Sequence, residues 1–181
     1  DDYLNIIRSN FSIKNSLFSN TYKDAFDSDF SKGFIENVSF EKVNNDAMDF
    51  SGSRVEGKKI YMQGVGDKGV SAGEKSTIKL NNIVIEDSNL AFASKDLSKL
   101  IISNGSLSRN KIVAAAYNKK TEYGPGKMEL FDTKLSNNNK SYLVEKNSSI
   151  QVDGEEIPIS EINFNKYSVS KWKIYLNYFF C

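Results

Sequence analysis

The chain has 181 residues, with 24 Lys and Arg against 23 Asp and Glu, a formal net charge of +1. This balance argues against a nucleic-acid-binding protein, because such proteins usually carry a clear basic excess. The sequence has no His, and Cys181 is its one cysteine, which excludes histidine-based catalysis, histidine metal sites and an internal disulfide. No apolar run reaches the roughly 18 residues of a spanning helix, so we expect no transmembrane segment.

The sequence repeats every 22 residues, and internal repeats are the first guide to a fold. The rows of the repeat begin at Asp2, Asp24, Asp46, Lys68, Leu90 and, in a sixth row, Ile112. The sixth row is stretched, because its second strand begins at Met128 where a strict repeat from Leu100 would place residue 122. A repeat of this length, with no room for helices, is typical of a solenoid.

Each row is predicted to contain three short strands in which apolar residues alternate with polar ones. The first strand places one apolar column at Leu4, Phe26, Met48, Val70, Phe92 and Ala114. The second strands are expected at 11–13, 34–35, 55, 78–80, 100–102, 128–130 and 150–152, and the third at 17–18, 38–40, 60–62, 83–85 and 106–107. The pattern predicts an all-β, single-stranded, right-handed parallel β-helix of about seven coils, stacked about 4.8 Å apart. We assign it to residues 1–157 and interpret 158–181 as a closing strand or cap.

Two polar ladders mark the predicted bends between strands. One ladder consists of Asn15, Asn37, Asn82 and Asn104, with Lys59 in the slot of the third coil. The other consists of Ser31, Ser53, Ser76 and Ser98. Stacked Asn amides bond to one another and tolerate left-handed backbone angles, so we interpret both ladders as structural.

Stacked inward aliphatic residues with an Asn ladder resemble the pectate-lyase-like superfamily of right-handed β-helices. Five runs are also similar to β-helix segments of bacterial exported proteins, some of them attached to a spore-coat CotH-like kinase domain. The runs are Asp24-Ala-Phe-Asp-Ser-Asp-Phe-Ser31, Asn45-Asp-Ala-Met-Asp-Phe-Ser-Gly-Ser53, Gly66-Asp-Lys-Gly-Val-Ser-Ala-Gly-Glu-Lys-Ser76, Ala93-Ser-Lys-Asp-Leu-Ser98 and Tyr117-Asn-Lys-Lys-Thr-Glu-Tyr-Gly-Pro-Gly126. The resemblance implies an exported or cell-surface setting and an N-terminal neighbouring domain missing here. It implies no activity, because the fold is shared more widely than its chemistry.

Acidic residues gather at the outward positions of the first strands. Asp27 and Asp49 are expected on adjacent coils, about 5 Å apart, and Asp29 lies about 7 Å along the strand from Asp27. Like charges directly opposite one another destabilise a sheet, so solvent, a raised pKa, a Lys or a bound cation must relieve the repulsion. Oxygen-only ligands suit Ca²⁺, which predicts a calcium site at these three residues. The alternative is a solvated acidic patch, with Lys68 and Lys95 nearby.

The outward columns also admit catalysis. Two carboxylates among Asp27, Asp29 and Asp49 are at spacings that suit glycoside hydrolysis. A calcium-dependent lyase acting on acidic glycans would instead need a base, for which Lys95 is the candidate. We expect a non-catalytic module that binds glycan. The alternatives are this lyase or hydrolase and a structural spacer without a ligand.

The stretched sixth row provides a candidate polysaccharide-binding loop at about residues 118–127. The loop brings Tyr117, Tyr123 and Lys119 beside the acidic strand face, near Lys95. Tyrosine rings beside polar groups form platforms for sugars, because a ring offers an apolar face and a hydroxyl. The other interpretation is a plain surface loop.

Overall fold

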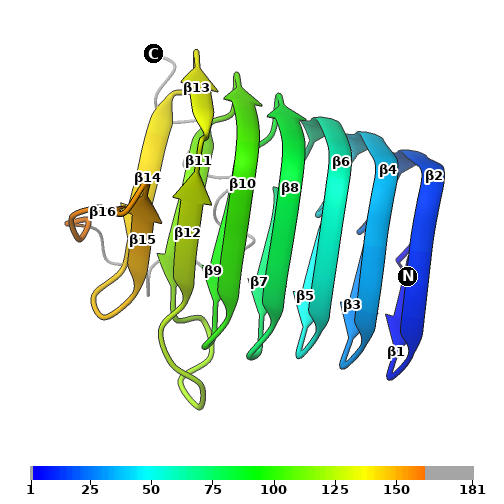
Figure 1. Cartoon of the computed structure of the whole chain (residues 1–181), viewed down its shortest axis with the longest axis horizontal. Helices are drawn as coiled ribbons and strands as arrows, with labels where there is room; N and C mark the ends of the chain where they lie inside the picture. Colours follow the sequence, from blue (N-terminus) through cyan, green and yellow to red (C-terminus); the bar gives the residue numbers. More distant parts are fainter. Residues whose placement is uncertain (1, 162–181) are drawn as a thin grey trace.

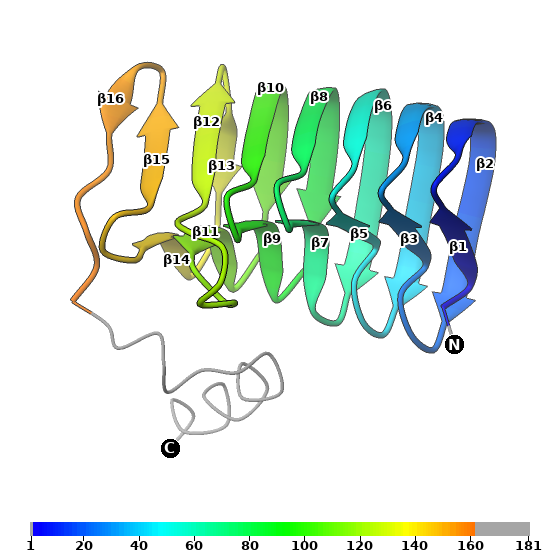
Figure 2. The same cartoon turned by 90° about the horizontal axis from the view of Figure 1, so that it is seen from below.

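The computed structural model describes residues 2–161, and every regular element among them is a β-strand (Figure 1). One sheet has seven strands: β1 (Leu4–Ile7), β3 (Phe26–Asp29), β5 (Met48–Ser51), β7 (Lys68–Gly73), β9 (Leu90–Lys95), β11 (Ile112–Tyr117) and β14 (Lys140–Val144). The other has nine: β2 (Asn10–Thr21), β4 (Lys32–Val43), β6 (Arg54–Val65), β8 (Thr77–Glu86), β10 (Lys99–Ser108), β12 (Lys127–Phe131), β13 (Lys134–Ser136), β15 (Ser149–Val152) and β16 (Glu155–Glu156). The chain alternates between the two sheets, so successive coils stack side by side (Figures 1 and 2).

The pairing register confirms the 22-residue repeat and the parallel stacking. Leu4 pairs with Phe26, Phe26 with Met48, and Met48 with Val70, each time in a parallel ladder. The chain is therefore a parallel β-solenoid of about seven turns. The stretch in the sixth row is also confirmed, because a loop at residues 118–126 separates β11 from β12.

The prediction of three strands per coil was wrong in one respect. In the first five coils the expected second and third strands form one strand of 10 to 12 residues. The bend falls inside this strand, where Asn15 has φ 49° and Asn37 has φ 55°. Pairing continues on both sides of these residues, and the Asn37 amide donates to Asn15 Oδ1 at 2.8 Å. A single left-handed residue turns the strand without ending its ladder.

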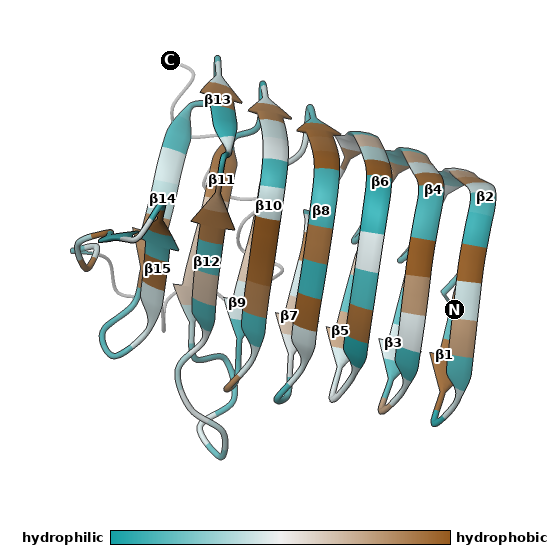
Figure 3. Cartoon of the chain, in the orientation of Figure 1, coloured by the Kyte–Doolittle hydropathy of each residue, from teal (hydrophilic) through white to brown (hydrophobic). Residues whose placement is uncertain are grey.

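The core lies between the two sheets, and alternating hydropathy along the long strands marks it (Figure 3). Phe26 and Phe50, from neighbouring inward columns on adjacent coils, meet edge to face, with ring centroids 5.9 Å apart. The predicted serine ladder is confirmed at the bend after the first strands. The backbone N–H of Ser31 donates to Ser53 Oγ at 3.0 Å, and that of Ser53 donates to Ser76 Oγ at 3.0 Å. Each coil therefore satisfies buried polar groups of its neighbour.

The described chain ends in an antiparallel pair. β15 turns through Asp153 and Gly154, both with positive φ, and pairs with β16. The predicted closing strand or cap lies, from residue 162 on, outside the described residues. No helix of the described chain is long and apolar enough to cross a membrane.

Candidate acidic site on the outer sheet face

The acidic residues lie where the repeat placed them, on the outer face of the seven-stranded sheet. Asp27 pairs in register with Asn5 on one side and with Asp49 on the other. The Asn5 amide donates to Asp27 Oδ2 at 2.9 Å. Asp29 stands two residues further along β3, beside Ser51. Because all three carboxylates project from adjacent strands of one sheet, each raises the cost of charging its neighbours.

Lys95 compensates the charge of Asp49, but it does so from a buried position. Its Nζ lies 3.7 Å from Asp49 Oδ1 and donates to Ser71 Oγ at 2.8 Å. A Cβ on Gly73 would come within 2.8 Å of Lys95 Cε, so the absence of a side chain at Gly73 makes room for the aliphatic part of Lys95. Lys95 thus lies on the outer sheet face beside Asp49, but only 7% of the residue is exposed, and the sequence did not indicate this burial.

The three carboxyls differ in their affinity for protons. Partial burial, together with the charges of Asp29 and Asp49, raises the pKa of Asp27 to about 7. Burial and the Asp49 charge also raise the pKa of Asp29. Burial works to raise the pKa of Asp49, but the Lys95 charge and the Ser71 hydroxyl outweigh it, so that pKa is lowered. The face thus relieves its repulsion through a raised proton affinity at Asp27 and a lysine beside Asp49.

A second ion cluster, at the entrance of the same strands, was not foreseen from the sequence as a buried unit. Lys68 is 1% exposed, and its Nζ lies 3.1 Å from Asp46 Oδ1 and 2.7 Å from Asp67 Oδ2. Burial works to lower the pKa of Lys68, but these two carboxylates outweigh it and raise that pKa. The sequence feature that could have indicated this cluster is Lys68, which follows Asp24 and Asp46 in one column of the repeat.

The loop at 118–126 borders the acidic face, so the two predicted sites form one. Asp96 holds the start of the loop, accepting from the backbone N–H of Lys119 at 2.7 Å and of Lys120 at 2.8 Å. Lys120 forms an ion pair with Glu74. The charge of Lys119 lowers the pKa of Asp49, and that of Lys120 works to lower the pKa of Asp29. Cations of the loop therefore act directly on the carboxylates.

The two predicted tyrosine platforms differ in position. Tyr117 pairs in register with Lys95 and is buried, so the prediction that its ring is open to a sugar was wrong. Tyr123 is partly exposed, and the Lys75 ammonium lies 5.7 Å from its ring centroid. Phe30, which was not predicted from the sequence as a site residue, is 54% exposed and lies beside the acidic face. The Arg8 guanidinium lies 5.6 Å from its ring centroid. The in-register Gly52 could have indicated Phe30, because a Cβ there would meet the Phe30 ring.

The arrangement of the carboxylates bears on cation binding. Within residues 2–161 no group of three or more acidic side chains is arranged to hold a metal ion. Calcium at Asp27, Asp29 and Asp49 therefore stays a prediction, and binding would have to displace the proton on Asp27 and draw the three carboxylates together.

Comparison with known proteins leaves the fold as the firm assignment. No protein-family model matches the chain, and no curated protein or solved structure does so either. The fold and the acidic face define the class: a parallel β-solenoid with a charged outer sheet face.

Proposed function

We propose that the chain is a non-catalytic glycan-binding module of an exported or cell-surface bacterial protein, and that the glycan binds across the acidic face. The observation that supports this is the approach of two loop lysines to partly exposed carboxyls, because the Lys119 charge acts on Asp49 and the Lys120 charge acts on Asp29. Carboxylates accept sugar hydroxyl donors, a protonated carboxyl and a lysine donate, and the Phe30 ring offers an apolar surface for a sugar face. A mixed set of this kind suits a polyhydroxylated ligand.

The resemblance to β-helix segments of bacterial exported proteins is part of this proposal, as is an N-terminal neighbouring domain of the CotH-like kinase kind. A pectate-lyase-like relationship belongs here as well. The support for all of these is the 22-residue repeat with its Asn and Ser ladders, now with their register and hydrogen bonds. The fold alone does not select among the functions of such proteins.

The test of glycan binding is a screen of immobilised neutral and acidic polysaccharides with the purified chain. The expected result is retention without cleavage, reduced about tenfold in Asp27→Asn/Asp29→Asn. The matched control is Glu155→Gln/Glu156→Gln, which removes two exposed acids on β16. Equal retention of both variants would contradict the assignment of the acidic face, and no retention of any polysaccharide would leave a structural spacer.

Calcium at Asp27, Asp29 and Asp49 is a separate part of the proposal. Ca²⁺ that binds only the folded chain raises the melting temperature by mass action. We expect a rise in millimolar Ca²⁺ that chelator abolishes, that Asp27→Asn/Asp49→Asn lacks, and that grows as the pH rises above 7, where Asp27 loses its proton. No shift at pH 8 would remove calcium from the proposal.

A second candidate function is hydrolysis of a glycoside, and the opposite pKa shifts of Asp27 and Asp49 favour it. A carboxyl that keeps its proton near pH 7 beside one that is ionised is the arrangement of a general acid and its partner. A lyase that uses Lys95 as base is less favoured, because Asp49 outweighs burial and raises the pKa of Lys95. Release of reducing ends from a polysaccharide, lost in Asp27→Asn, would support hydrolysis; unsaturated products would support a lyase.

A further inference from the structure

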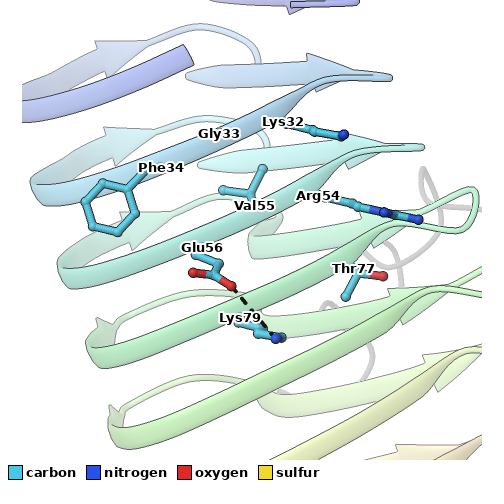
Figure 4. A pocket seen from close by; sticks show the side chains of 8 residues that line it. All are labelled: Lys32, Gly33, Phe34, Arg54, Val55, Glu56, Thr77 and Lys79. Carbon is cyan, nitrogen blue, oxygen red and sulfur yellow. Dashed lines mark ion pairs between the residues drawn. The ribbon is translucent and has the colours of Figure 1, made fainter. Parts of the chain in front are cut away.

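A groove crosses the outer face of the other sheet, over β4, β6 and β8 (Figure 4). Its volume is about 330 Å³. Two outward columns, two residues apart along the strands, form its walls. One column is Lys32, Arg54 and Thr77, and the other is Phe34, Glu56 and Lys79, with Gly33 and Val55 between them. The groove is therefore built by the same repeat as the acidic face, but on a different sheet.

Two cations in the groove have no compensating charge. Lys32 pairs in register with Arg54 on the next coil, and like charges directly opposite one another destabilise a sheet. Two lysines near the groove do have carboxylate partners: Lys79 lies 3.8 Å from Glu56, and Lys58 lies 2.9 Å from Glu36. Neither Lys32 nor Arg54 has such a partner within the described part of the chain, although both are exposed. An anion between them would relieve the repulsion.

The opposite wall adds groups of another kind. The Phe34 ring is partly exposed, with Lys14 Nζ 5.6 Å and Lys58 Nζ 5.9 Å from its centroid. An aromatic ring offers an apolar surface to the C–H face of a sugar. On the cation wall, in register with Arg54, the Thr77 hydroxyl can donate or accept a hydrogen bond. The groove thus combines a cation pair, an aromatic surface and a hydroxyl within a short distance along the solenoid.

We propose that this groove binds an anionic sugar residue of an acidic polysaccharide. Lys32 and Arg54 hold the carboxylate or sulfate group, and Phe34 contacts the sugar ring. Nucleic acid fits less well, because Glu56 lines the groove and the chain carries a net charge of only +1. A polysaccharide presents hydroxyls to Glu56 and an anionic group to the cations. This site does not depend on the acidic face or on the function proposed for it.

The experiment is a titration of the whole chain with three labelled hexasaccharides: a galacturonic acid hexamer, a sulfated heparin hexamer and a neutral glucose hexamer. The first two distinguish a carboxylate from a sulfate ligand. We expect one of them to bind, the neutral hexamer not to bind, and added salt to weaken the complex because exposed charges are screened. Lys32→Gln/Arg54→Gln should weaken binding by about tenfold or more. Phe34→Leu, which keeps an apolar side chain, should weaken it less.

The matched control is Lys134→Gln/Lys140→Gln, which removes two exposed lysines in later coils and changes the net charge equally. Its affinity should equal that of the unchanged chain at fixed salt. Circular dichroism of every variant separates lost binding from lost folding. The proposal is overturned if Lys32→Gln/Arg54→Gln and the control Lys134→Gln/Lys140→Gln lose affinity equally, or if no acidic hexamer binds at low salt. The groove is then a solvated charged surface. If affinity falls only in Asp27→Asn/Asp29→Asn, the hexasaccharide binds at the acidic face and not in the groove.

Discussion

Two regions of one sheet face carry opposite chemistry at equivalent positions of the repeat. In one outward column Asp27 and Asp49 are followed by Ser71, and then by Ala93, Ala115 and Leu143. The last three are buried, whereas the first two are partly exposed. Lys68 and Lys95 lie at the boundary and pair with carboxylates of the acidic region. The repeat therefore fixes the direction of a side chain, but not whether water reaches it.

The largest effect is expected where the boundary is most buried. Lys68→Met keeps the bulk of the side chain but leaves Asp46 and Asp67 without their cation. Removing one partner of a buried ion pair leaves an uncompensated charge, so the free energy of unfolding should fall by about 3–5 kcal/mol in urea denaturation. Lys58→Met, which breaks an exposed pair with Glu36, should cost at most about 1 kcal/mol. Similar losses in the two variants would show that the Lys68 cluster is solvated.

The next prediction concerns a carboxylate introduced into the apolar region of the same sheet face. Ala115→Asp adds a carboxylate to the same column as Asp27, at a residue that is 0% exposed. The new group must be desolvated or hold its proton, so we expect a loss of about 2–4 kcal/mol, larger at pH 8 than at pH 5. Ala115→Ser, polar but uncharged, should cost less at both pH values. A carboxylate tolerated at pH 8 would mean that water reaches this region.

The sequence predicted the fold closely because inward side chains follow a period of two and coils follow a period of 22. Both periods depend on local geometry and can be read without knowing tertiary contacts. The environment of Lys95 could not be read, because its burial depends on neighbours in other coils: Asp49, Ser71 and the space above Gly73. The burial of Tyr117 could not be predicted from the sequence for the same reason. Continuous long strands were missed because an Asn at a bend was taken to end a strand, whereas Asn37 turns it and pairing resumes.

Lys95→Gln tests whether the lysine or solvent stabilises the Asp49 charge. Asp49 is 27% exposed at its side chain, so the loss should be smaller than for Lys68, about 1–3 kcal/mol at pH 8. Without the cation, burial raises the folded-state pKa of Asp49 above its unfolded value, and stability then falls as the pH rises. The loss should therefore be smaller at pH 5, where Asp49 can take up a proton. Lys120→Gln, which breaks a partly exposed pair with Glu74, provides the control, with a smaller loss than Lys95→Gln and little change between the two pH values.

The smallest effect concerns the proton on Asp27. The folded chain holds this proton up to about pH 7, whereas the unfolded chain releases it near the ordinary pKa of 3.8. A raised folded-state pKa means that the native state binds more protons between these values, so stability falls as the pH rises through this window. After allowance for partial exposure, the fall should be about 1 kcal/mol.

Asp27→Asn removes the titrating group and retains an oxygen that can accept from Asn5. It should unfold at a higher urea concentration than the unchanged chain at pH 8, at about the same concentration at pH 4, and with a flatter pH dependence. Glu155→Gln, at an exposed acid on β16, should leave the slope as it is. If Asp27→Asn keeps the full slope, the proton lies on another carboxyl. Solvent screening, and not protonation of Asp27, would then reduce the repulsion between the adjacent carboxylates of the acidic region.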